Sequence, residues 1–150
     1  SHSDKWIICG VSEKTLGVDI EGSYQNNILP IAKRFFTNEE YIYIQSHSYN
    51  DRMNAFYKIW TLKESYIKCI GKGLSIPLNS FHYEFKENYI SLYQSNILQS
   101  GYYFQTMNTD DEYHIALCGN GIENELWKGA IQKISMEELI VASKALGFFN

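Results

Sequence analysis

The chain has 150 residues and a net charge of −4, and 45% of its residues are hydrophobic and 20% charged. These values are typical of one globular domain that buries a core without disulfides. The acidic balance argues against a nucleic-acid binder, and no apolar run is long enough for a membrane helix. No signal peptide is visible, so we expect a cytoplasmic protein.

The cysteines, Cys9, Cys69 and Cys118, lie far apart and form no Cys-x-x-Cys pair. Their spacing argues against a zinc site, and we expect reduced, mostly buried thiols. The chain has no initiator methionine and starts directly in a strand pattern. We interpret this start either as a tag remnant before the strand or as a sign that residues 1–150 are one domain of a longer protein.

The first part of the chain predicts a β-hairpin and a short helix. Residues 5–12 and 15–21 carry apolar strand patterns joined by a turn, which is typical of two paired strands. A polar loop with Gly and Asn signals follows. Residues 28–36 predict a short helix with Pro30 in its first turn, where proline is tolerated.

Two further helices are predicted from their caps. Thr37 and Glu40 have the spacing of a capping box, which begins a second helix. Asp51 is expected to cap the longest helix, residues 52–70, whose apolar residues recur at three- and four-residue steps. Gly71 is expected to end it.

The second part of the chain changes to strands and closes with a helix. Apolar and aromatic runs predict strands at 81–85, 89–94, 102–108 and 113–119. Ser135 and Glu138 form another capping box, for a last helix that ends near Gly147. Helices followed by successive strands indicate an α+β fold, a twisted antiparallel sheet packed on helices, in a single domain.

Two carboxylates stand together in the stretch "GVDIE". Residues i and i+2 of a strand share a face, so Asp19 and Glu21 project together while Val18 and Ile20 point to the core. Carboxylates that converge need a cation, a shared proton or open solvent. Open solvent is the structural alternative, because strand ends are often charged.

The longest predicted helix carries a second candidate group in "WTLKESYIK". Glu64 and Lys68 are one turn apart, which on its own is typical of a solvated surface pair. Together with Asp19 and Glu21, however, Glu64 completes a set of three carboxylates. Three hard oxygen ligands suit Mg²⁺, with Mn²⁺ also open, and a lysine beside them can neutralise a diphosphate.

The two motifs together resemble the signature of the 4'-phosphopantetheinyl transferases. That pattern is G-[VI]-D-x-E, a long gap, W-[ST]-x-K-E-[SA]-x-x-K and a G-x-G-L turn, here "GVDIE" and "WTLKESYIKCIGKGL". The acidic residue after the aspartate and the W-[ST]-x-K-E-S form resemble the Sfp-type branch. "SHSDKWIICGVS" and "IAKRFFTNEEY" are similar to further elements of that branch, so the resemblance spans residues 1 to about 85.

The resemblance implies roles for five residues. Asp19, Glu21 and Glu64 are similar to the Mg²⁺ ligands of the family. Lys68 is similar to the lysine that contacts the coenzyme A phosphates and assists the leaving group. His2 is similar to the histidine that touches the 3'-phosphate of coenzyme A.

The reaction implied is the attack of a carrier-protein serine on the β-phosphate of coenzyme A. Phosphopantetheine moves to an acyl or peptidyl carrier protein, and 3',5'-ADP leaves. Metal and Lys68 would stabilise the developing charge. The serine needs a base. Glu64 is the first candidate and Glu40 the second, although the capping box gives Glu40 a competing structural role.

The chain also departs from the Sfp-type pattern. Members of that branch have two similar halves with coenzyme A in the cleft between them, and this chain resembles only the second half. Its partner is then the missing N-terminal half or a second copy of itself. The alternatives are an inactive half-domain and a non-catalytic module that binds a carrier protein or coenzyme A. A generic nucleotide site is disfavoured, because "GKGLS" lacks Walker spacing.

Other polar residues have simpler interpretations. Lys63 either reaches the phosphates or is solvated, and the sequence does not decide between these. Lys72, in "GKG", is assigned to a helix C-cap rather than a phosphate loop. The remaining histidines and a run of acidic residues are assigned structural or solvated positions: His47, His82, His114, Asp110, Asp111 and Glu112.

Overall fold

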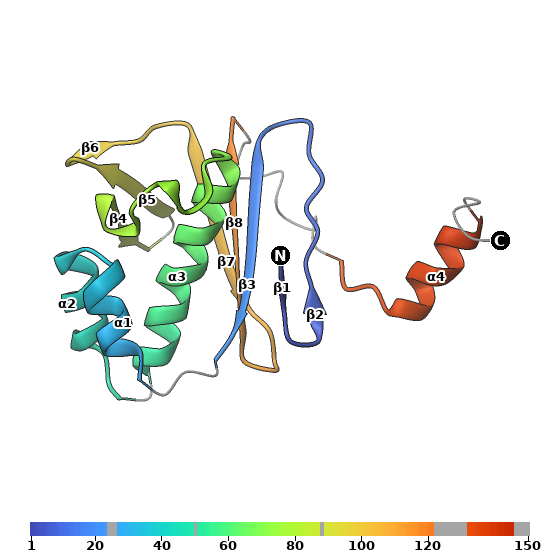
Figure 1. Cartoon of the computed structure of the whole chain (residues 1–150), viewed down its shortest axis with the longest axis horizontal. Coiled ribbons are helices and arrows are strands. Elements are labelled where there is room, and N and C mark those ends of the chain that lie inside the picture. Colours follow the sequence, from blue (N-terminus) through green and yellow to red (C-terminus); the bar gives the residue numbers. More distant parts are fainter. Residues whose placement is uncertain (24–26, 50, 88, 122–131, 146–150) are drawn as a thin grey trace.

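The computed structural model describes residues 1–23, 27–49, 51–87, 89–121 and 132–145. The fold is α+β, as predicted. A long helix, α3 (Asp51–Cys69), lies between a three-stranded antiparallel sheet and a layer that contains two short helices and a second antiparallel sheet (Figure 1). β1 (His2–Ser3) and β2 (Trp6–Ile7) form a third, two-stranded sheet, so the predicted strands divide among three sheets instead of joining one.

The structure confirms the predicted helices and the four longer strands of the second half. The other helices are α1 (Ile28–Phe35), α2 (Asn38–Ser46) and α4 (Met136–Ala145). The strands are β1 (His2–Ser3), β2 (Trp6–Ile7), β3 (Leu16–Gly22), β4 (Phe81–Lys86), β5 (Tyr89–Gln94), β6 (Ile97–Leu98), β7 (Tyr102–Asn108) and β8 (Tyr113–Asn120). The sequence does not predict β6, because so short a strand carries no periodicity.

The predicted N-terminal hairpin is wrong in its pairing. β3 pairs antiparallel with β8, from Leu16↔Gly119 to Gly22↔Tyr113, and β8 pairs with β7 on its other edge. Among the described residues, β1 and β2 instead pair with each other. Alternation indicates which faces of a strand are buried but not which strand lies beside it. β8 is buried from Tyr113 to Gly119, so it takes the central position of this sheet.

The helix ends follow local chemistry. Thr37 and Glu40 form the predicted capping box, and Ser135 and Glu138 form the second one. α3 ends at Cys69, two residues before Gly71, whose φ is +67°, and the Gly71 and Lys72 amides bond to the carbonyls of Lys68 and Ile67. This is a Schellman motif, so "GKG" is a helix C-cap as predicted.

Two predictions about helix ends differ from the structure or lie outside its described part. Asp51 begins α3 itself instead of capping it, and the Ser48 hydroxyl accepts the Asp51 amide hydrogen. Gly147 lies outside the described residues.

α3 packs directly on β3 because Gly17 has no side chain. A Cβ at Gly17 would lie 1.9 Å from the Ser65 carbonyl oxygen and 2.5 Å from the Cys69 nitrogen. Both distances are far inside van der Waals contact, so the helix backbone lies where a side chain would otherwise be. The face of β3 that carries Gly17 also carries Asp19 and Glu21, since alternate residues of a strand share a face.

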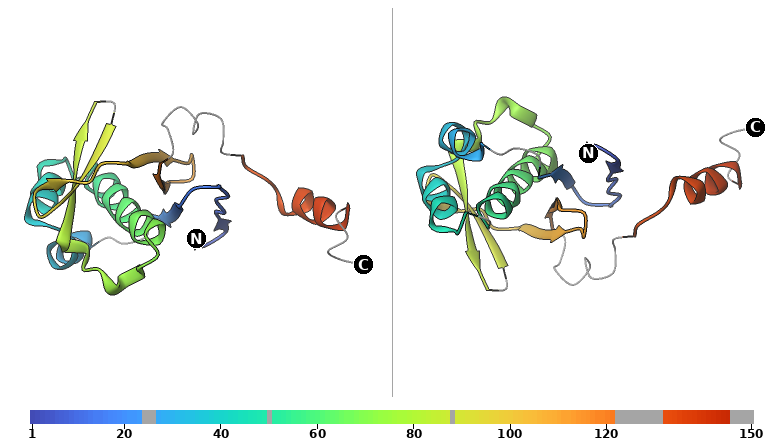
Figure 2. Two further views of the ribbon diagram at one scale, coloured as in Figure 1. Left: turned by 90° about the horizontal axis from the view of Figure 1, so that it is seen from above. Right: turned by 90° about the horizontal axis from the view of Figure 1, so that it is seen from below.

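α4 stands away from the other elements in all three views (Figures 1 and 2). Its apolar residues Met136, Leu139, Ile140 and Val141 are exposed. No helix in the described part of the chain combines the length and the apolarity that crossing a bilayer requires.

We predict that Gly17→Ala destabilises the fold more than Gly71→Ala. The added methyl group at position 17 meets helix backbone, so we expect a loss of about 2–3 kcal/mol in the free energy of unfolding. At Gly71 the space is open and only the left-handed backbone is penalised, by roughly 1–2 kcal/mol. Urea denaturation of both variants measures the difference, and an equal loss would contradict the close contact of α3 with β3.

Candidate active site between β3 and α3

Asp19 lies at the centre of the predicted site. It is 2% exposed, and its Oδ1 accepts hydrogen bonds from Lys68 Nζ at 2.5 Å and from Ser1 Oγ at 2.8 Å. Its Oδ2 is buried and, within the described part of the chain, has no hydrogen-bond partner. Burial raises the pKa of Asp19, and the contact with Lys68 opposes that shift. The carboxylate therefore keeps an unmatched acceptor oxygen.

Glu21 and Glu64 join Asp19 from the two elements. Burial raises the pKa of each glutamate, and the charge of Asp19 raises both further. The pKa of Glu21 is also raised by the charge of Glu64. The three carboxylates predicted from the motifs are thus close enough to repel one another, and the open-solvent interpretation does not describe a buried Asp19.

Lys68 is the cation of the cluster. Its ion pair is with Asp19 on β3, so the one-turn pair with Glu64 is not the contact that it makes among the described residues. The Lys68 side chain is 38% exposed while that of Asp19 is 2% exposed. Lys68 can therefore meet a solute from outside without the buried carboxylate moving.

The N-terminal ribbon, residues 1–7 with strands β1 and β2, covers one side of the site. Ser3 Oγ donates to Glu21 Oε2 at 3.4 Å and accepts the Gly22 amide hydrogen at 3.1 Å. His2 is exposed, and strand alternation points it away from the side that carries Ser1 and Ser3. The predicted phosphate contact of His2 therefore lies outside the carboxylate cluster itself.

The three carboxylates of the site have the chemistry to bind a divalent cation, but their side chains are not arranged around one point. Among the described residues, no three His, Cys, Asp or Glu side chains converge as a ready set of ligands. Asp19 Oδ2 nevertheless is a buried acceptor without a donor, and three mutually repelling carboxylates are the hard oxygen ligands that Mg²⁺ prefers. Lys68 supplies the compensating charge in the structure.

The sequence predicts that Lys63 either reaches the phosphates or is solvated, and both predictions are wrong. Lys63 is fully buried, where its ammonium pairs with Glu40 at 2.9 Å and donates to the Leu78 and Phe81 carbonyls at 2.7 Å each. Burial lowers the pKa of Lys63, and Glu40 opposes that shift. Neighbouring helical positions point about 100° apart, so Glu64 reaches the site while Lys63 enters the core on the other side.

Glu40 is held in the same core, away from the role of a base. It is 2% exposed and accepts hydrogen bonds from the Thr37 and Tyr83 amides in addition to the ammonium of Lys63. The competing structural role therefore describes Glu40. Glu64 remains the candidate base.

His114 is a buried polar residue next to the site that the sequence does not single out. It lies opposite Glu21 in the β3–β8 ladder and stacks on Tyr57, with 5.4 Å between ring centroids. Ser23 Oγ donates to the Glu112 carbonyl and lies 2.9 Å from His114 Nε2, so the serine oxygen is an acceptor for an Nε2 hydrogen. The structural position predicted for His114 is correct, but the apolar strand around it gives no signal of its hydrogen bond to Ser23.

The remaining candidates are structural or exposed, as predicted. His47 packs against Tyr43, and His82 stacks on Tyr93. Asp110, Asp111 and Glu112 are exposed at the turn between β7 and β8, where Asp111 pairs with Lys5 at 3.0 Å.

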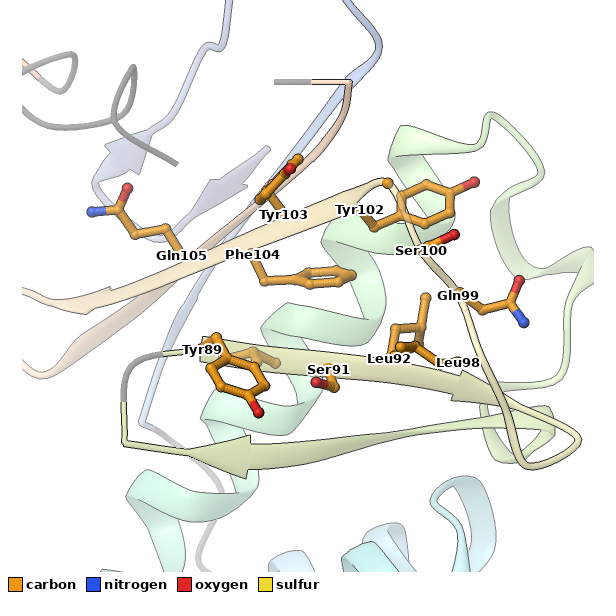
Figure 3. Close-up of a pocket in the computed structure, with 12 residues that line it drawn as sticks. Tyr89, Ser91, Leu92, Leu98, Gln99, Ser100, Tyr102, Tyr103, Phe104 and Gln105 are labelled. Atoms are coloured by element: carbon orange, nitrogen blue, oxygen red, sulfur yellow. The ribbon is translucent and has the colours of Figure 1, made fainter. Parts of the chain in front are cut away.

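A separate groove of about 660 Å³ lies between β5 and β7 (Figure 3). Leu92, Leu98, Tyr102 and Phe104 lie along it, with Tyr89 at one end. Among the described residues that line it, none carries a charged side chain. A diphosphate would find no cation there, so the groove is not the predicted site.

Comparison with known proteins identifies the family. The family model of the 4'-phosphopantetheinyl transferase superfamily matches residues 15–118. The chain is 44% identical to the 4'-phosphopantetheinyl transferase gsp of Aneurinibacillus migulanus over 96 residues, which cover 64% of this chain and 40% of that protein. It is 34% identical to 4'-phosphopantetheinyl transferase Sfp of Bacillus subtilis over 140 residues, which cover 93% and 61%.

Solved structures share the fold. Holo-[acyl-carrier-protein] synthase of Thermotoga maritima matches with a TM-score of 0.54 and 14% identity over 90% of each chain. A holo-(acyl-carrier-protein) synthase of Bacillus anthracis, in complex with CoA (3',5'-ADP), matches with a TM-score of 0.53 and 14% identity over 71% of this chain and 94% of that one.

The chain belongs to the 4'-phosphopantetheinyl transferase superfamily. Within it, the relatives confirm the resemblance to the Sfp-type branch. The chain spans about half the length of the curated relatives that it matches.

We predict that Lys63→Met strongly destabilises the fold. The change leaves Glu40 as an unpaired buried charge, and breaking a buried pair in this way costs about 3–5 kcal/mol of unfolding free energy. The double variant Lys63→Met/Glu40→Gln removes that charge and should recover part of the loss. Urea denaturation of the three proteins measures it, and a Lys63→Met loss below about 1 kcal/mol would show that the pair behaves as a surface contact.

A pH titration tests the burial of His114. Burial lowers its pKa from 6.5 to about 4, so between these values the unfolded chain binds the proton more readily. The contribution of His114 to stability is therefore full above pH 6.5 and is lost as the pH falls towards 4. His114→Phe keeps an aromatic ring against Tyr57 but cannot titrate. We expect the stability of the native chain to fall more steeply than that of the variant over this range; parallel curves would contradict a neutral, buried His114.

Proposed function

We propose that this chain carries the catalytic carboxylates of a transferase that moves 4'-phosphopantetheine from coenzyme A to a serine of an acyl or peptidyl carrier protein, releasing 3',5'-ADP. The observation that carries the proposal is the contact of Lys68 with Asp19 inside a cluster of three carboxylates. These are the residues that the family motifs single out. The names of the Bacillus and Aneurinibacillus relatives support the same activity.

Asp19, Glu21 and Glu64 are the residues that would hold Mg²⁺, or Mn²⁺ in its place. When bound, the cation supplies positive charge to a pyrophosphate group. The buried Oδ2 of Asp19 and the mutual repulsion of the carboxylates support this assignment.

Lys68 is assigned to the phosphates of coenzyme A. Its ammonium is partly exposed at the edge of the site, where it can donate to a phosphate oxygen and stabilise the charge of the departing 3',5'-ADP. His2, exposed on the N-terminal ribbon, is assigned to the 3'-phosphate. Support for both assignments comes from the motif positions of the two residues.

The proton of the attacking serine goes to a carboxylate. The serine oxygen forms a bond to the β-phosphorus while the bond from that phosphorus to the bridging oxygen breaks. Glu64 is the proposed base, directly or through a water, because burial and Asp19 raise its pKa and so favour proton uptake.

We propose that a partner supplies the other positively charged side chains that are needed to bind coenzyme A. The net charge of −4 provides little attraction for a polyanion, and the curated relatives are longer than this chain. The partner is either the additional half that Sfp-type proteins carry or a second copy of this chain.

A non-catalytic module that binds coenzyme A or a carrier protein is the second candidate. One observation favours it: among the described residues the carboxylates are not arranged as a ready metal site, and Lys68 neutralises Asp19. Transfer activity separates the two candidates.

We predict that incubation with an apo carrier protein, coenzyme A and Mg²⁺ adds one phosphopantetheine to the carrier, as measured by mass spectrometry. Glu64→Gln and Lys68→Ala should each lower the rate at least about 100-fold, since each removes charge that acts on the reacting group. Circular dichroism should show unchanged folds. Lys86→Ala, at an exposed lysine of β4, is the matched control.

Two outcomes would change this proposal. Near-native transfer by Glu64→Gln would mean that the three-carboxylate site is wrong. No mass gain from a folded chain that still binds Mn²⁺ would favour the non-catalytic module, or a site completed by the additional half.

A further inference from the structure

Two of the three cysteines meet at the end of α3, next to the candidate site. Cys69 is the last residue of α3 and Cys118 lies on β8; both are buried in one core cluster, while Cys9 is exposed. The sequence places Cys69 and Cys118 far apart, so only the tertiary structure pairs them.

The close contact at Gly17 is what brings the two thiols together. Gly17 is the ladder partner of Cys118, and the backbone of Cys69 occupies the space where a Gly17 side chain would lie. Cys69 therefore sits over the Gly17–Cys118 pair of the sheet, and both cysteines pack in the same core cluster.

The two thiols are not equivalent. The Cys69 thiol donates to the Thr15 carbonyl oxygen at 3.7 Å, and its polar surroundings, with the side chain of Cys118 first among them, lower its pKa to about 7. Burial raises the pKa of Cys118, and the side chain of Cys69 raises it further. Cys69 is 6% exposed and Cys118 is 0% exposed, so a small oxidant reaches Cys69 first and Cys118 is the resolving thiol.

We propose that Cys69 and Cys118 form a peroxide-sensitive dithiol that closes to an intramolecular disulfide. The Cys69 thiolate attacks one oxygen of a hydroperoxide, the O–O bond breaks, and Cys69 becomes a sulfenic acid while hydroxide or alkoxide leaves. The Cys118 sulfur then attacks the Cys69 sulfur, its proton and the sulfenic hydroxyl leave as water, and the S–S bond forms. The two thiols lose two electrons and the peroxide gains them.

The bond would tie the last residue of α3 to the central strand β8. Lys68 precedes Cys69 in the chain, so the disulfide adds a covalent link next to the ammonium that pairs with Asp19. The proposal concerns the thiols alone and does not depend on transferase activity.

The test uses the native chain and hydrogen peroxide. The folded protein is oxidised, denatured without reductant, alkylated and analysed by mass spectrometry with peptide mapping. We expect all three cysteines to be alkylated before oxidation and Cys9 alone afterwards, with a peptide that links Cys69 to Cys118 and a mass lower by about 2 Da, the two hydrogens lost. Dithiothreitol should restore full alkylation.

Matched variants separate the dithiol from general oxidation. Cys9→Ser should still form the link, whereas Cys69→Ser and Cys118→Ser should not. Because Cys118 is fully buried, Cys118→Ala is included as a variant that adds no polar atom to the core. Full alkylation of Cys69 and Cys118 after peroxide treatment, or a link that involves Cys9, would overturn the proposal; mapping of the native chain gives this result even where a variant fails to fold.

Discussion

The direct contact of α3 with β3 at Gly17 is the constraint on which the rest of this structure depends. Any side chain at this position would collide with the helix backbone at Ser65 and Cys69. With none there, the last turns of α3 lie against the strand, and Lys68 reaches Asp19 two residues along the same strand face. The same contact brings Cys69 over Cys118. One glycine thus sets the geometry of the candidate site and of the thiol pair.

Two lysines of α3 show how helix geometry divides structural from functional charge. Lys63 points into the core, where Glu40 and two carbonyls satisfy its ammonium. Lys68 points to the edge of β3, where its charge balances a carboxylate but remains open to solvent. The buried charge of Lys63 needs a partner, whereas Lys68 is itself the partner that the buried Asp19 needs. The pair of Lys63 and Glu40 is fixed in the core, whereas Lys68 can contact a solute while it pairs with Asp19.

The carboxylates of the candidate site repel one another, and a bound cation would reduce this repulsion. Burial raises the pKa of Asp19, Glu21 and Glu64, and the charge of Asp19 raises the pKa of both glutamates further. Lys68 offsets part of this cost, and Asp19 Oδ2 lacks a donor among the described residues. Such uncompensated charge is typical of sites that bind a charged ligand, because a purely structural core would satisfy it.

The sequence by itself determined the family, the helices with their two capping boxes and the three carboxylates with Lys68, because these depend on local patterns and on motifs whose spacing is typical of the family. Tertiary structure alone decided the partner of β3, the burial of Lys63 and the places of His114 and Cys118. Strand pairing, depth of burial and contacts between distant residues are set by how elements pack, and periodicity along the chain does not record that. Lys63 and Glu64 are adjacent in the sequence, but only the packing of α3 against both sheets assigns one to the core and the other to the site.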